Sequence, residues 1–212
     1  MKKTLAVLCI GFFCISVINS YFGKTSDALA NSVIRFHVLA NSDKEEDQSL
    51  KLKVRDRIIK EMEPLFDKNG DISAAREVII ENMDKIKTVA KDEVKKHGFD
   101  YDVNVSLGNS YFPTKEYGDV VLPTGNYEAL KIEIGDARGQ NWWCVLFPPL
   151  CFVDESCVSE STSTGKLVAN VGKENAELVK KEKSSGVKLK FKSYEIWQSG
   201  KQKIACFFGI DK

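Results

Sequence analysis

Two cysteines and two tryptophans, the side chains best suited to covalent chemistry or to partner contact, lie close to one proline pair. Cys144 and Cys151 lie on either side of Pro148-Pro149, and Trp142 and Trp143 come directly before Cys144. Proline lacks the amide hydrogen that a central strand donates, so the pair predicts a rigid bend between two short extended arms. One cysteine then lies on each arm, where it could join a disulfide, stay a buried thiol or act as a nucleophile.

A cysteine nucleophile needs a base beside it, and His37 is the candidate base. In an exported domain, however, two cysteines across a bend more often oxidise to a bridge, so we expect a Cys144–Cys151 disulfide and no catalytic residue. The sequence holds two histidines, no CxxC pair and no HExxH motif. A zinc site needs about three or four ligands at short paired spacings, so we expect no metal and no cofactor.

The two tryptophans are the strongest candidates for contact with a partner. Neighbouring residues of a strand point to opposite faces, so only one of Trp142 and Trp143 can belong to the core. The other is left for water, for a partner or for cover by the polar C-terminal segment. Because tryptophan is enriched among residues that dominate interface energy, Trp142, Trp143, Asn141 and His37 form the candidate partner-binding site.

The N-terminus is typical of an export leader. Lys2-Lys3 precede an apolar stretch from Thr4 to Ile18, and Ala28-Leu29-Ala30 supplies the small residues that a signal peptidase recognises. Cleavage after Ala30 is the first interpretation. The polar gap before it is long for a cleavage region, so an uncleaved membrane anchor over residues 4–22 is the alternative, and either gives the chain a transient or lasting membrane contact.

The charges of the chain argue against nucleic acid as a partner. Lys and Arg total 31 and Asp and Glu total 30, which gives a net charge of +1. Because the positive and negative charges are almost equal in number, the chain provides no broad basic surface for a phosphate backbone.

Hydrophobic periodicity predicts a strand followed by a helix at the start of the domain. Residues 33–40 alternate as a half-buried strand, with Ile34, Phe36 and Val38 on one face. Ser42 and Glu45 could form a capping box that starts a helix over about 43–62. We interpret the carboxylates of residues 43–47 as partners of the helix dipole and not as a catalytic acid and base.

A second helix is predicted over about 72–97, with Gly98 as its left-handed cap. Residues 101–107 and 127–134 alternate as strands, residues 111–124 are a loop rich in Pro and Gly, and the tryptophan segment supplies the last arms.

This order, β-α-α-β-β-β, predicts an α+β fold with two helices on one face of a mostly antiparallel sheet. We divide the chain into a signal peptide or membrane anchor at 1–30, the α+β domain at 31–155 and a polar, Lys/Glu-rich appendage at 156–212.

Several segments, in order, resemble the stage II sporulation protein R family of endospore-forming bacteria. They are VIRFHVLANSD at 33–43, EDQ at 46–48, KVRD at 53–56, PTKEYG at 113–118, GNYEAL at 125–130, GQNWWC at 139–144 and PPLC at 148–151. The resemblance implies a protein secreted from the forespore into the space between the forespore and mother-cell membranes. There it would activate a membrane-embedded aspartic protease of the mother cell, which processes the pro-form of the mother-cell sigma factor.

Two other classes remain as alternatives. One is an extracytoplasmic cysteine-type hydrolase that acts on peptide or cell-wall material through Cys144 or Cys151 with His37. The other is a structural envelope protein without a signalling role.

Overall fold

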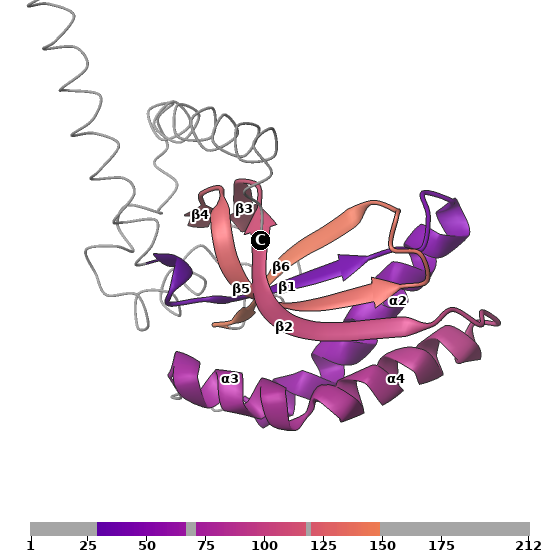
Figure 1. The fold of residues 1–212 in the computed structure, drawn as a ribbon, viewed down its shortest axis with the longest axis horizontal. Coiled ribbons are helices and arrows are strands. Elements are labelled where there is room, and N and C mark those ends of the chain that lie inside the picture. The colour runs from indigo at the N-terminus through magenta and orange to yellow at the C-terminus, as the bar shows by residue number, and fades with distance from the viewer. Residues whose placement is uncertain (1–28, 67–70, 118–119, 149–212) are drawn as a thin grey trace, which may run out of the picture.

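The computed structural model describes residues 29–66, 71–117 and 120–148, and these form an α+β domain. The main sheet contains β1 (Ile34–Leu39), β2 (Val103–Phe112), β5 (Gly125–Ile134) and β6 (Asn141–Phe147), and a small second sheet contains β3 (Lys115–Tyr117) and β4 (Val120–Leu122). The described helices are α2 (Glu45–Met62), α3 (Ile72–Glu81) and α4 (Met83–Lys96), with a 3-10 turn, Glu63–Leu65, after α2. Figure 1 shows α3 and α4 running end to end along the sheet and α2 behind it, while β3 and β4 lie at the far end. The predicted fold class is confirmed.

The main sheet has the order β2-β5-β1-β6. β1 pairs with β6 and β2 pairs with β5 in antiparallel fashion, whereas β1 and β5 are parallel. The prediction of a mostly antiparallel sheet is therefore confirmed, but β5 and β6 are not neighbours, because β1 lies between them.

Strand β1 is central, and this corrects the prediction that it is half-buried. Ile34, Phe36 and Val38 face the helices and belong to the main core, as their alternation predicted. On the other face Arg35 and His37 are also buried, at 0% and 6% exposure. A second apolar cluster covers that face with residues from β2, β4, β5 and β6.

Helix α2 buries the predicted stripe of Leu50, Val54 and Ile58, but the predicted capping box is wrong. The residue before the helix is Lys44, which makes no side-chain cap. The Ser42 hydroxyl instead donates a 2.6 Å hydrogen bond to the carboxylate of Asp47. Ser42 thus donates to a buried carboxylate inside the helix, and its oxygen accepts a longer hydrogen bond, 3.2 Å, from the amide of Lys44 just before the helix.

The predicted second helix is two helices, because the chain breaks at Asn82. The Asn82 side chain donates to the Val78 carbonyl at 2.8 Å, which competes with the backbone ladder at the junction. α3 is capped at its start by Asp71, whose carboxylate accepts from the Ala74 amide at 2.8 Å. The predicted end is confirmed, since Gly98 follows α4 with a φ of +82°.

The segment predicted as a loop at 111–124 contains regular structure. β2 continues to Phe112, and β3 and β4 follow as an antiparallel pair. Val120 and Leu122 pack with Tyr127 in the second cluster. Strands of three residues are too short to show a period in sequence, which explains the error.

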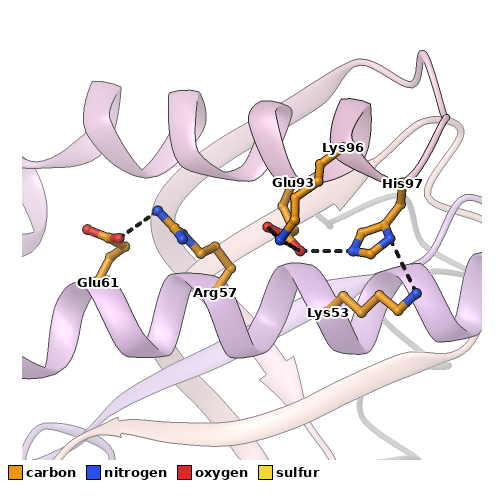
Figure 2. Close-up of polar contacts among 6 residues, drawn as sticks. All are labelled: Lys53, Arg57, Glu61, Glu93, Lys96 and His97. Atoms are coloured by element: carbon orange, nitrogen blue, oxygen red, sulfur yellow. Dashed lines mark hydrogen bonds and ion pairs between the residues drawn. The ribbon is translucent and has the colours of Figure 1, made fainter.

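Polar contacts join the two long helices at their outer surface (Figure 2). The His97 ring nitrogen Nε2 lies 2.9 Å from the Glu93 carboxylate, and Nδ1 lies 3.4 Å from the Lys53 ammonium of α2. Burial alone would raise the pKa of Glu93, but the hydrogen bonds from His97 and Lys96 hold it below its ordinary value. Of these contacts, the one between His97 and Lys53 joins the end of α4 to α2, whereas those among Glu93, Lys96 and His97 are local to the end of α4.

Candidate interaction site

The side chains of His37 on β1 and Asn141 on β6, the edge strand beside it, contact each other. Residue 141 begins β6 opposite Leu39, and its side-chain oxygen lies 2.7 Å from His37 Nε2. Asn141 is exposed whereas His37 is buried. The structure therefore brings these two sequence-predicted residues together, with the amide as the part that a partner could reach.

Trp143 stacks on His37, its neighbour in the β1–β6 register. The ring centroids are 3.8 Å apart with an interplanar angle of 22°, and Phe112 meets the indole edge-on at 4.7 Å. Burial lowers the pKa of His37, and the hydrogen bond with Asn141 opposes that effect only in part. The imidazole is therefore neutral near pH 7 and behaves as one ring of an aromatic stack.

Trp142 points to the opposite face, as strand geometry predicted. The Arg55 guanidinium of α2 lies 4.1 Å from its ring centroid, a cation–π contact, and the ring packs against the main core. Its Nε1 is buried and finds no hydrogen-bond partner among the residues that the structure describes. Both tryptophans are half-buried against their own domain, so neither stands free of it; whether either contacts a partner stays a prediction.

Arg35 is the residue of this face that sequence reasoning missed. Its Nε donates to the Cys144 carbonyl at 2.9 Å and its Nη2 donates to the Tyr117 hydroxyl at 2.7 Å. The rings of Phe112 and Tyr127 lie 4.3 and 5.0 Å from the guanidinium carbon. Alternation placed Arg35 on a wet face, and the aromatic residues that bury it lie about 80 or more positions later in the sequence. Among the described residues no carboxylate forms an ion pair with it.

Next to Arg35 and the rings around it, a group of polar residues connects the β1–α2 loop to the β5–β6 loop by hydrogen bonds. We call this group, residues 41–43, 47–48, 51 and 135–140, the loop joint. Asn41 accepts from the Asp136 amide at 2.9 Å and donates to the Asp47 carboxylate at 2.9 Å. Asp43 accepts from the Gln140 amide at 2.8 Å. The carboxylates predicted to serve only the helix dipole thus also hold two loops together.

Buried polar groups complete the loop joint. Lys51 is 4% exposed and donates to the Gln140 carbonyl at 2.9 Å and to the Gln48 side chain at 2.5 Å. Burial lowers the pKa of Lys51. For Asp47 burial would raise the pKa, but hydrogen bonds from Ser42 and Asn41 lower it below its ordinary value. Asn141 follows the loop joint directly, so the joint sets the start of β6.

The geometry separates Cys144 from His37. Cys144 pairs with Phe36 in register and lies in the main core on the helix side, whereas His37 lies in the aromatic stack on the other side. The Cys144–His37 pair of the hydrolase alternative is therefore not brought together, whereas the pair of Cys151 with His37 lies outside the described residues. Cys144 is disulfide-bonded. The predicted partner, Cys151, lies outside the described residues, as do the leader and the C-terminal appendage, so those predictions stay predictions.

Within the described ranges, no helix is long and apolar enough to cross a membrane. The same part of the chain contains no group of His, Cys, Asp or Glu side chains placed to hold a metal ion.

Together these contacts describe a small α+β domain in which the loop joint and the buried face of Arg35 and His37 position the start of β6. The chain belongs to the stage II sporulation protein R family, whose model matches residues 30–157. Stage II sporulation protein R of Bacillus subtilis (strain 168) is 36% identical over 215 residues, which covers 90% of this chain and 95% of that protein. No solved structure matches the chain. The family resemblance predicted from the sequence blocks is confirmed, and it supports a role in sporulation.

Proposed function

We propose that this protein is an exported signalling ligand of endospore formation. It is made in the forespore, delivered into the space between the two membranes, and activates the membrane-embedded aspartic protease of the mother cell that processes the pro-form of the mother-cell sigma factor. The observation that carries the proposal is the family match over residues 30–157, together with 36% identity to a stage II sporulation protein R along nearly the whole chain.

The arrangement of the described residues supports action by contact. The one nucleophile–base pair that the sequence offered within the described residues is split between the two faces of the sheet. A ligand of this kind must bind the active state of its protease more tightly than the inactive state, and a tenfold shift needs about 1.4 kcal/mol. One or two well-packed side chains at an interface supply that much.

The surface proposed for this contact is the start of β6 with the ring stack behind it. Asn141 is exposed and is held in place by its bond to His37, while Trp143 is half-buried on the same histidine. The loop joint on one side, and the aromatic rings of Phe112 and Tyr127 around Arg35 on the other, keep these groups rigid. A rigid surface loses little conformational entropy when a partner binds, which favours recognition.

Delivery is proposed to depend on residues 1–30. This stretch, with its basic start and apolar core, acts as a cleaved leader or as an anchor formed by residues 4–22. In either form the domain is presented on the outer side of the forespore membrane.

The test is complementation of a sporulating strain that lacks its own stage II sporulation protein R. The full chain, expressed in the forespore, should restore processing of the sigma-factor precursor on an immunoblot. Asn141→Ala should reduce processing, whereas Asn126→Ala, a matched change at another exposed strand residue, should not. A secreted and folded chain that leaves the precursor unprocessed would refute the signalling role. Full processing by Asn141→Ala would refute only the surface.

A further inference from the structure

The side-chain amide of Asn141 has one polar atom bound inside the domain and one left for solvent. Its oxygen, Oδ1, lies 2.7 Å from the Nε2 atom of His37, while the residue itself is exposed. The amide nitrogen, Nδ2, has no hydrogen-bond partner among the residues that the structure describes. Whichever atom of the amide bonds to His37, the other is presented to anything that contacts the start of β6. The orientation of the amide therefore decides which chemical group this position can recognise.

His37 fixes that orientation, because its ring is buried and neutral. Burial lowers its pKa, so near pH 7 the ring carries one N–H group. With the proton on Nε2, the ring donates to Oδ1 of Asn141, and the lone pair of Nδ1 is left without a donor. With the proton on Nδ1, the amide must turn over and donate to Nε2. The Nδ1–H group is then left without an acceptor, since Nδ1 is buried and has no partner within the described residues.

The arrangement with the proton on Nε2 is the favoured one. Buried N–H groups that lack an acceptor are rarer in proteins than acceptors that lack a donor. The separation of 2.7 Å between Nε2 and Oδ1 is that of a hydrogen bond between N–H and oxygen. The ring of Trp143, stacked on the imidazole at 3.8 Å, holds the ring plane in place. The exposed part of Asn141 is therefore its NH2 group, which donates hydrogen bonds and accepts none.

The charges near Asn141 favour a neutral acceptor over a carboxylate. On β5 the Lys131 ammonium lies 2.6 Å from the Glu133 carboxylate. In the loop before β6 the Arg138 guanidinium lies 4.0 Å from the Asp136 carboxylate. Each of these bases thus has an acid beside it, so neither supplies an uncompensated positive charge that would attract a carboxylate to this position. A neutral oxygen with lone pairs, as in the carbonyl of a peptide group, matches the NH2 group without needing a cation.

Apolar side chains flank the NH2 group on the same face of the sheet. Leu39 is the register partner of Asn141, Trp143 is two residues further along β6, and both are half-buried. We propose that Asn141 donates a hydrogen bond to a carbonyl oxygen of a peptide segment of the partner, which lies against Leu39 and Trp143. His37 is the positioning residue that turns the amide this way. The inference rests on the proposed function, in which the start of β6 contacts the protease of the mother cell.

Asn141→Asp tests the polarity of this contact in the complemented strain, with the full chain expressed at graded levels. The new carboxylate still accepts from His37, but it presents an acceptor where the amide presents donors. The level of chain needed for half-maximal processing should rise about tenfold or more. Asn141→Ala loses only the hydrogen bond, so its level should rise less, by about two- to tenfold. Asn126→Asp adds the same charge at another exposed strand residue and should leave the level unchanged.

Imidazole nitrogen-15 chemical shifts test the orientation without a variant at Asn141. In the full-length gene product, secreted and recovered in its mature form, Nε2 of His37 should show the shift of a protonated nitrogen at pH 7. Nδ1 should show that of a bare nitrogen. The chain has two histidines, so the signals that remain in His97→Gln belong to His37. This measurement keeps the inference testable even if Asn141→Asp does not fold.

The outcomes separate this inference from the proposed function. A proton on Nδ1 of His37 would overturn the inference. So would a folded and secreted Asn141→Asp chain that processes the precursor as well as Asn141→Ala does, because the partner would then present no acceptor here. Both results leave the signalling role intact. An unmodified chain that is secreted and processes nothing would overturn both proposals.

Discussion

Replacing Gly139 with alanine should destabilise the domain strongly, because this glycine lies against the opposite loop of the loop joint. An added Cβ would lie 2.2 Å from the Ser42 carbonyl oxygen and 2.9 Å from the Ala40 Cβ, whereas ordinary contact begins at 3.4 Å. The overlap of about 1 Å is with backbone and cannot be relieved by turning a side chain. The two loops must therefore move apart.

The magnitude follows from that movement. Backbone shifts of this kind cost about 1–3 kcal/mol. The shift also weakens the bonds from the Gly139 amide to the Ala40 carbonyl at 2.9 Å and from the Gln140 amide to Asp43 at 2.8 Å. Each bond contributes about 1 kcal/mol, so we expect a total loss of about 3 kcal/mol in the free energy of unfolding.

Urea unfolding followed by tryptophan fluorescence measures this loss, with all proteins at one concentration. The midpoint should fall and the m-value should stay unchanged. Gly108→Ala is the matched control, because its Cβ meets nothing within 4 Å, and it should change the stability by less than about 0.5 kcal/mol. The reasoning fails if Gly139→Ala is as stable as the parent, or if both alanine variants lose stability equally.

Three further outcomes are expected from titratable and buried groups. The pKa of His37 in the folded protein lies below 6.5, so as the pH falls the unfolded chain binds a proton at this histidine before the folded protein does. The free energy of unfolding should therefore be level above about pH 6.5 and fall below it. His37→Gln should remove that pH dependence in urea unfolding. The pKa of Asp47 in the folded protein lies below 3.8, so its contribution to the free energy of unfolding is present above that pH and lost below it. Asp47→Asn should therefore lower the free energy of unfolding by about 1–3 kcal/mol at neutral pH. Calorimetry should show that the difference in stability between the variant and the parent shrinks in acid. Lys51→Met leaves the Gln140 carbonyl without its 2.9 Å donor and should cost about 1–3 kcal/mol by urea unfolding, and an unchanged midpoint would show that this bond contributes nothing.

Local pattern was enough to predict the elements whose faces differ clearly. The stripe of α2 has apolar residues at helical spacing, and its bounds were predicted to within two residues. The alternation of β5 placed Leu130, Ile132 and Ile134 correctly in the main core. The opposite faces of Trp142 and Trp143 followed from strand geometry alone.

The errors have a common physical origin in contacts between distant segments. Arg35 and His37 are polar, as residues on a solvent-exposed face of a strand usually are, but residues of β2, β3 and β6 cover them. The apolar stripe continues across Asn82, so its period could not show the break between α3 and α4. The partner of Ser42 was a carboxylate five residues on, which a capping motif does not consider.

The order of the sheet sets when this domain can fold. β1 comes first in the chain, yet it pairs only with β5 and β6, and the Arg35 side chain reaches a carbonyl 109 positions later. Pairs this far apart in the sequence make folding slow, since β1 cannot gain both of its neighbours until β6, the last described strand, is available. Under the export proposed above, a chain that stays unfolded until β6 is available would suit passage through a narrow translocation channel.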